Sequence, residues 1–337
     1  MNKKRVVVIA PGRGTYTRET SGYLKKFSSF AKSHISWMDR KRIESGYKSL
    51  TELDTQPFKT KTHMLGENAS SLIYACSISD FFSINQDKYE IVGVTGNSMG
   101  WYTALALSGS IKIEDGFHLV QNMGSMMEDH IIGGQIIYPI MNQEWILDKS
   151  KKVNLLKKVE EAGAYISIIL GGYMVIGGAQ KSLDNLLYNL PKEEKFPFQI
   201  PYHAAFHTPL MKDISKKAFE QFSNSFFNKP NIPLVDGRGH IWTPYSTDIT
   251  TLKNYTLKDQ VLDSYNFTGS IEVALKEFCP DKIILLGPGN TLGGAIGQIM
   301  IKHNWHNIGS KRDFIEKQKE DPFLISIGEE TQRGFIS

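Results

Sequence analysis

Short apolar runs followed by glycine-rich turns alternate with helical patterns along this chain of 337 residues. Residues 6–10 form a continuous apolar run rich in β-branched side chains, which is typical of a strand buried on both faces of a parallel sheet. Residues 89–94 and 282–286 predict two further strands. Apolar positions recur at helical spacing in residues 63–83 and 111–127. Strands that alternate with helices in this way favour an α/β fold.

A different order of elements is predicted within residues 133–202. Four strands and two helices follow one another there as β-α-β-β-α-β, which is the ferredoxin-like arrangement. These elements are expected at residues 134–140, 148–162, 165–170, 173–177, 182–190 and 196–202. We therefore expect an inserted subdomain at 133–202, and a main α/β core formed by residues 1–132 and 203–310.

Two stretches lack a strong pattern. Residues 20–60 are mostly polar, aromatic and basic, and we expect short helices with surface loops there. Residues 311–337 are charged and poorly patterned, and we expect them to form a C-terminal tail.

Composition excludes several classes of protein. Hydrophobic residues make up 41% and charged residues 22% of the chain, which is ordinary for a globular protein. The net charge of +4 does not demand nucleic acid; it suits an acidic partner or a phosphorylated ligand, or simply a lysine-rich surface. The two cysteines show no metal-binding spacing and fit a reducing compartment. No segment approaches the ~20 apolar residues of a membrane span, so we expect a cytoplasmic protein without metal, membrane or nucleic-acid partners.

The stretch around Ser98 carries the most specific chemical signal. Gly96-x-Ser98-x-Gly100 lies between a predicted strand and an Ala/Leu-rich helix that starts near Tyr102. Strand, sharp turn and helix form the context in which such a serine becomes an exposed nucleophile. Free N–H groups at the start of the helix can hold an oxyanion. A serine nucleophile also needs a base, which another part of the chain must supply.

Five segments carry a wider resemblance. They are Pro11–Gly14, Gly96–Leu105, Tyr173–Gly178, Phe206–Met211 and Gly287–Gly289. In this order, over nearly the whole chain, they resemble the malonyl-CoA:acyl carrier protein transacylase family, which includes the acyltransferase domains of fatty acid and polyketide synthases. The resemblance implies an α/β-hydrolase-like core with an inserted ferredoxin-like subdomain, consistent with the order of elements above.

The resemblance also implies a ping-pong acyl transfer that uses no bound cofactor. Ser98 would attack the thioester of an acyl-CoA, and the thiol of an acyl carrier protein's phosphopantetheine arm would then take the acyl group. His207 matches the family's base. Asn266 falls where the family tends to have the amide that orients this histidine, although it could instead cap a helix. The oxyanion donors would be the main-chain N–H groups of Met99 and Arg13.

Four residues are expected to contact substrate, and three of them depart from the family pattern. Arg13 stands where the family has glutamine, Asn97 where it has histidine, and Met123 where malonyl-specific members have a carboxylate-binding arginine. A buried malonyl carboxylate without a partner would cost several kcal/mol, whereas methionine favours an apolar chain. We therefore expect an uncharged acyl group, acetyl or a short to medium chain. Phe206, just before the histidine, favours the small end of that range.

Other interpretations of these residues stay open. Arg13 could pair with a malonyl carboxylate from the other side of the site, or with the phosphates of CoA or the carrier, and Met123 could be an ordinary core residue. The acyl acceptor could be water, which would make the protein an acyl hydrolase that acts on carrier proteins. A non-enzymatic carrier-binding scaffold is a third hypothesis, against which the presence of both Ser98 and His207 argues. The chain is expected to act as a monomer, on a separate carrier protein, in fatty acid or polyketide synthesis.

Overall fold

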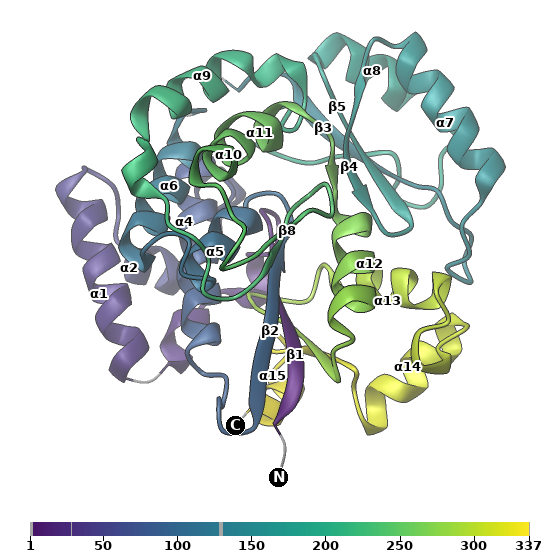
Figure 1. Ribbon diagram of the computed structural model, residues 1–337. Coiled ribbons are helices and arrows are strands. Elements are labelled where there is room, and N and C mark those ends of the chain that lie inside the picture. The colour runs from purple at the N-terminus through teal and green to yellow at the C-terminus, as the bar shows by residue number, and fades with distance from the viewer. Residues whose placement is uncertain (1–2, 28, 128–130, 337) are drawn as a thin grey trace.

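Two β-sheets organise the protein. The computed structural model describes residues 3–27, 29–127 and 131–336. The larger sheet has the strand order β11-β10-β1-β2-β7-β8 and is parallel except for the β7–β8 pair. Its strands are β1 (Lys4–Ala10), β2 (Tyr89–Gly96), β7 (Leu234–Val235), β8 (Ile241–Trp242), β10 (Lys282–Leu285) and β11 (Leu324–Ser326). Figure 1 shows β1 and β2 at the centre of the molecule, with helices on both sides.

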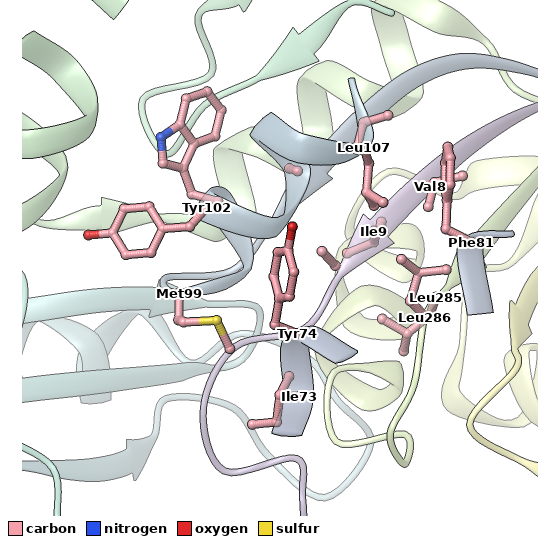
Figure 2. Packing of buried hydrophobic residues seen from close by; sticks show 14 of the residues in the cluster. Val8, Ile9, Ile73, Tyr74, Phe81, Met99, Tyr102, Leu107, Leu285 and Leu286 are labelled. Atoms are coloured by element: carbon pink, nitrogen blue, oxygen red, sulfur yellow. The ribbon is translucent and has the colours of Figure 1, made fainter. Parts of the chain in front are cut away.

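The predicted buried strand at residues 6–10 is confirmed as the inner part of β1. It pairs with β10 on one side and β2 on the other, and every residue from Val6 to Ala10 is fully buried. Side chains of β1 pack against α4 (Gly66–Phe81) and α5 (Gly100–Leu107), as seen around Val8 and Ile9 in Figure 2. Because the strands are parallel, their carboxyl ends meet at one edge of the sheet, where ligands bind in open α/β folds.

The ferredoxin-like subdomain is confirmed by its sheet, which has the order β6-β3-β5-β4-β9. Its elements are β3 (Gly134–Pro139), α7 (Lys149–Glu161), β4 (Tyr165–Leu170), β5 (Tyr173–Gly178), α8 (Gln180–Asn189) and β6 (Phe198–Gln199). The last strand, expected over 196–202, has only two residues. A further strand, β9 (Tyr265–Asn266), comes from the core and pairs with β4, so this sheet is not confined to residues 133–202.

The remaining helices pack around the larger sheet. The others of the core are α1 (Ser29–Glu44), α2 (Leu50–Thr55), α3 (Thr60–His63), α6 (Ile113–Ser125), α9 (Lys212–Gln221), α10 (Ile249–Asn254), α11 (Gln260–Leu262), α12 (Phe267–Phe278), α13 (Gly293–Lys302), α14 (Lys311–Glu320) and α15 (Glu330–Arg333). The prediction of only short helices in 20–60 was wrong, because α1 has 16 residues. Its sparse buried apolar positions, Ala31, Ile35 and Met38, follow helical spacing but are outnumbered by polar residues.

The prediction of a C-terminal tail at 311–337 was also wrong. β11 adds an edge strand to the large sheet beside β10, and Ile336 is buried. Arg333 of α15 forms an ion pair with the fully buried Asp80 of α4. A strand of three residues is too short to show a hydrophobic pattern in a charged sequence. An ion pair between residues far apart in the chain leaves no local pattern.

Within the described residues, no helix is both long and apolar enough to cross a bilayer. The same part of the chain contains no cluster of three side chains suited to hold a metal ion.

Candidate active site

Ser98 lies in the sharp turn that joins β2 to α5. Its backbone is in the left-handed region, with φ of 56°. The flanking glycines permit the turn: a Cβ built on Gly96 would lie 2.2 Å from the backbone of Gly100, and one built on Gly100 would lie 2.3 Å from the carbonyl oxygen of Ala10. Real side chains do not fit at such distances, so the turn requires glycine at both positions. This strained strand–turn–helix geometry is the one predicted for a serine nucleophile.

His207 faces Ser98 from a different part of the chain. Its Nε2 lies 2.7 Å from the Ser98 Oγ, and its Nδ1 lies 2.6 Å from the main-chain carbonyl oxygen of Gln260. Since the carbonyl can only accept, Nδ1 carries the proton, and Nε2 is left to accept from the Ser98 hydroxyl. The prediction that these two residues come together is therefore confirmed in geometry.

Gln260 positions the pair through both its main chain and its side chain. It begins the short helix α11, whose last carbonyl groups have no helical partner, so its carbonyl is available to His207. Its side-chain Nε2 donates to the carbonyl oxygen of Ser98 at 3.1 Å, and its Oε1 accepts from the Tyr102 hydroxyl at 3.1 Å. The sequence could not reveal this residue, because every residue type offers the same carbonyl.

The expectation that Asn266 orients His207 was wrong. The Asn266 side chain accepts instead from the main-chain N–H of Gly269 at 2.9 Å and caps the N-terminus of α12. The capping alternative is thus the correct one, since an asparagine at this position satisfies a free N–H of the first helical turn.

Burial sets the charge of the two histidines near the site. Burial lowers the pKa of His207 to about 4, although the hydrogen bond with Gln260 opposes the shift, so the ring is neutral at pH 7. Burial also holds the pKa of His203 well below its ordinary value, and the nearby positive charge of Arg13 adds to this. His203 bonds through Nδ1 to the side chain of Gln135 at 2.8 Å, away from Ser98, which fits a structural residue.

The loop that carries His207 is fixed to the ferredoxin-like sheet. The Ser167 hydroxyl donates to the carbonyl oxygen of Phe206 at 2.8 Å and accepts from the side chain of Gln135 at 2.6 Å. The subdomain thereby holds the loop against the end of β2, and its role in the site is positional.

A cavity opens beside the Ser98–His207 pair. Its empty volume is about 500 Å³, including the open mouth. It is lined by Arg13, Ser70, Ser98, Met99, Tyr102, Val120, Met123, Gly124, Phe206, His207, Ile214, Gln260 and Val261. Three of the four expected substrate contacts, Met123, Phe206 and Arg13, line it. Asn97 does not: its side chain is buried beside Gly12, whose added Cβ would lie 2.5 Å from the Asn97 carbonyl oxygen.

Arg13 is the charged side chain of this mostly apolar lining. Its Nη2 donates to the carbonyl oxygens of Met64 and Tyr202, each at 2.9 Å, and the guanidinium lies 5.5 Å from the ring centre of Phe206. Burial lowers the pKa of Arg13 to about 10, while the charge of Glu67 opposes the shift. The guanidinium thus joins three loops around the cavity, and its Nε has no hydrogen-bond partner among the described residues.

The predicted oxyanion donors are available. In the described part of the chain, neither the Met99 nor the Arg13 main-chain N–H donates to a protein acceptor. Met99 directly follows the nucleophile at the start of α5, and Gly12, the neighbour of Arg13, is in contact with the same turn.

Fold and site together define a class: an α/β-hydrolase-like core with a ferredoxin-like insert and a serine–histidine pair at the strand edge, the architecture of an acyltransferase. No protein-family model matches the chain. It is 25% identical over 227 residues to the malonyl CoA-acyl carrier protein transacylase of Bacillus subtilis, covering 63% of this chain and 68% of the relative. The Haemophilus influenzae protein of the same name is 25% identical over 215 residues, covering 61% of this chain and 65% of the relative.

Solved structures agree with this relationship. The malonyl-CoA:ACP transacylase of Synechocystis superposes with a TM-score of 0.76 at 18% identity, covering 98% of this chain and 99% of that one. The transacylase of Xanthomonas oryzae gives a TM-score of 0.74 at 19% identity, covering 99% and 98%. The resemblance that the five motifs indicated is confirmed: the relatives of this chain, in sequence and in fold, are malonyl-CoA:acyl carrier protein transacylases.

Proposed function

We propose that this protein is an S-acyltransferase that carries an acyl group, as an ester on Ser98, from an acyl-CoA to the phosphopantetheine thiol of an acyl carrier protein. The observation that carries the proposal is the 2.7 Å contact between the Ser98 Oγ and the neutral His207 Nε2, at the wall of a mostly apolar cavity. The names of the relatives support the same chemistry.

The reaction follows from the protonation state of His207. Its Nε2 takes the hydroxyl proton as the Ser98 oxygen attacks the thioester carbonyl, and the Gln260 carbonyl oxygen stabilises the imidazolium that forms. The main-chain N–H groups of Met99 and Arg13 hold the oxyanion. Collapse breaks the C–S bond, and the imidazolium gives its proton to the departing CoA thiolate. The carrier thiol then repeats these steps in reverse order and restores the free serine.

The acyl group is proposed to be uncharged. Met123 lines the cavity together with Val120, Phe206, Ile214 and Val261, so a chain seated there meets mainly hydrocarbon. The charge of Arg13 is already partly balanced, since its Nη2 has two carbonyl acceptors and the nearby charge of Glu67 opposes the lowering of its pKa by burial. An apolar chain that binds here therefore does not leave the Arg13 guanidinium without partners.

Malonyl transfer is a second candidate, and one observation favours it. The guanidinium of Arg13 lines the cavity, and its Nε lacks a hydrogen-bond partner among the described residues. A small movement of this side chain would offer a malonyl carboxylate a charged donor. In this case Arg13 would bind the malonyl carboxylate, in place of the arginine that malonyl-specific relatives have at the position of Met123.

Intact-protein mass spectrometry tests both candidates. The protein is incubated with acetyl-, butyryl-, hexanoyl- and malonyl-CoA, and the mass added to wild type and to the Ser98→Ala variant is compared. Adducts from the uncharged donors, absent from Ser98→Ala, are expected. Adducts that persist in Ser98→Ala would reject Ser98 as the nucleophile, and a malonyl adduct that Arg13→Gln removes would favour the second candidate.

Two further measurements fix the acyl selectivity and the acceptor. Met123→Arg is expected to admit malonyl, while Met123→Leu, which conserves volume, should keep the wild-type selectivity. Mixing the acyl-enzyme with a phosphopantetheinylated carrier should move the acyl group onto the carrier thiol. Release of free acid at the same rate with and without carrier would instead identify a hydrolase.

A further inference from the structure

One hydroxyl group in the lining of the acyl cavity has no role in the mechanism and no hydrogen-bond partner among the described residues. Ser70, on α4, is only 2% exposed and lines the cavity. Its hydroxyl makes no hydrogen bond with any residue that the structure describes. The hydroxyl oxygen is nevertheless not completely shielded from solvent. The small accessible surface of this residue therefore includes its Oγ, which faces the cavity.

The other buried serines of α4 behave differently. The hydroxyl of Ser71 donates to the side chain of Gln121, that of Ser77 to the carbonyl oxygen of Gly287, and that of Ser79 to the carbonyl oxygen of Ala75, each at 2.7 Å. Buried hydroxyls in native proteins are normally satisfied in this way, because an unmade hydrogen bond costs free energy. Ser70 is thus an exception along its own helix.

The wall beside this hydroxyl is formed by a close backbone contact between two glycines. A Cβ built on Gly124 would lie 3.1 Å from the Ser70 Oγ and 2.5 Å from the carbonyl oxygen of Gly66, so no side chain can fill this corner from α6. A Cβ built on Gly66 would lie 3.6 Å from the Arg13 Nη1. Ser70 and Arg13, both of which line the cavity, therefore lie beside this contact between α4 and α6, which forms one corner of the cavity.

We propose that this corner, with Ser70 as its hydrogen-bonding group, receives an oxygen atom on the acyl chain beyond the thioester carbonyl. The inference rests on the proposed acyl transfer and narrows its substrate class to short acyl groups with a hydroxyl or keto oxygen. A serine hydroxyl can donate to a keto oxygen and can either donate to or accept from a hydroxyl, so both groups fit. A plain alkyl chain of the same length would leave the Ser70 hydroxyl unsatisfied and would exclude the water that could otherwise bond to it.

The test compares oxygenated and plain donors of equal chain length. Rates of Ser98 acylation are measured with 3-hydroxybutyryl-CoA, acetoacetyl-CoA and butyryl-CoA, for wild type and for Ser70→Ala. Wild type is expected to prefer at least one of the oxygenated donors over butyryl-CoA. In Ser70→Ala the ratio of the oxygenated to the butyryl rate should fall about tenfold, the order expected for one hydrogen bond.

Ser71→Ala is the matched control, because it removes a buried hydroxyl one residue away that bonds within the protein. It is expected to leave the ratio of oxygenated to plain donors unchanged. If Ser70→Ala changes all three rates equally, or if wild type shows no preference, the inference about the corner is wrong while the acyltransferase proposal stands. If no donor acylates Ser98 in wild type, the proposed function itself fails, and the two failures are thus distinguishable.

Discussion

Two buried polar networks of the protein use hydrogen bonds for different purposes. In the first, Ser98, His207 and the Gln260 carbonyl form a chain of neutral groups that ends at a cavity. In the second, Asp80 accepts from the Tyr23 hydroxyl at 2.8 Å, from the Gly287 N–H at 2.7 Å and from Arg333 at 2.6 Å.

In the second network, the buried carboxylate bonds only to other groups of the protein among the described residues. Both oxygens of the buried Asp80 carboxylate are occupied, and the contacts join α4 to the turn after β10 and to the C-terminal helix α15. Burial raises the pKa of Asp80, and the positive charge of Arg333 opposes the shift. By contrast, the Ser98 hydroxyl of the first network lies at the cavity, a space that a ligand can fill. Under the proposed function, the first network serves chemistry, whereas the second holds segments together.

Replacing Ser98 is the strongest way to separate the two networks. Ser98→Ala is expected to lower the acyl-transfer rate at least about a thousandfold, because no other described side chain lies at the elbow with a base beside it. Thermal unfolding should stay close to that of wild type. Transfer activity that survives in a purified, folded Ser98→Ala sample would contradict the assignment.

The second largest effect on activity is expected from His207. His207→Gln should reduce acylation about 10²- to 10⁴-fold, the usual contribution of a general base. Stopped-flow measurement of CoA release reports this step directly. His203→Gln is the comparison variant: a loss as large as that of His207→Gln would show that the two histidines share the catalytic role.

The pH dependence of acylation sharpens the same assignment. Only the neutral imidazole accepts the Ser98 proton, and burial lowers the pKa of His207 to about 4. The acylation rate should therefore be constant from about pH 6 to pH 8 and should fall tenfold per pH unit below about pH 4. The measurement uses brief exposure to each pH with a check of refolded activity. An inflection near the ordinary histidine pKa would mean that the His207 ring is more accessible to water in the free enzyme than the structure shows.

Breaking the second network should change stability instead of chemistry. Arg333→Met leaves the buried Asp80 carboxylate without its charged partner, and we expect a loss of about 3–5 kcal/mol in the free energy of unfolding. Chemical denaturation measures this, and the acylation rate per folded molecule should be retained. The double variant Asp80→Asn/Arg333→Met should recover much of the loss, because no unpaired charge then remains.

The smallest effect is expected at Asn266. Asn266→Ala removes the cap of α12 and should cost about 1 kcal/mol of stability, with little change in the acylation rate. Asn266→Asp, which can still cap, is the control. A large loss of activity with normal stability would restore Asn266 to the role of orienting His207.

The sequence by itself determined much of this protein. Apolar runs and helical spacing identified the central strands, α4 and the βαββαβ order, because a buried strand and an amphipathic helix leave period-specific patterns. The glycines around Ser98 marked the nucleophile turn, since only glycine fits at that distance from the neighbouring backbone. Five motifs in order were enough to indicate the relatives, and they pointed to His207 as the candidate base.

Only the tertiary structure decided the groups that act through the main chain or through long-range contacts. The carbonyl of Gln260 carries no side-chain signal, so the sequence pointed to Asn266, which is a helix cap. The strand β11 and the Arg333–Asp80 pair depend on partners far away in the chain, which local patterns do not reveal. The prediction of a C-terminal tail was wrong for this reason. Ser70 is one of several serines on a helix, and only the packing of the helices around the cavity placed it in the lining. Local patterns report how a segment is buried, whereas hydrogen-bond partners depend on which segments meet.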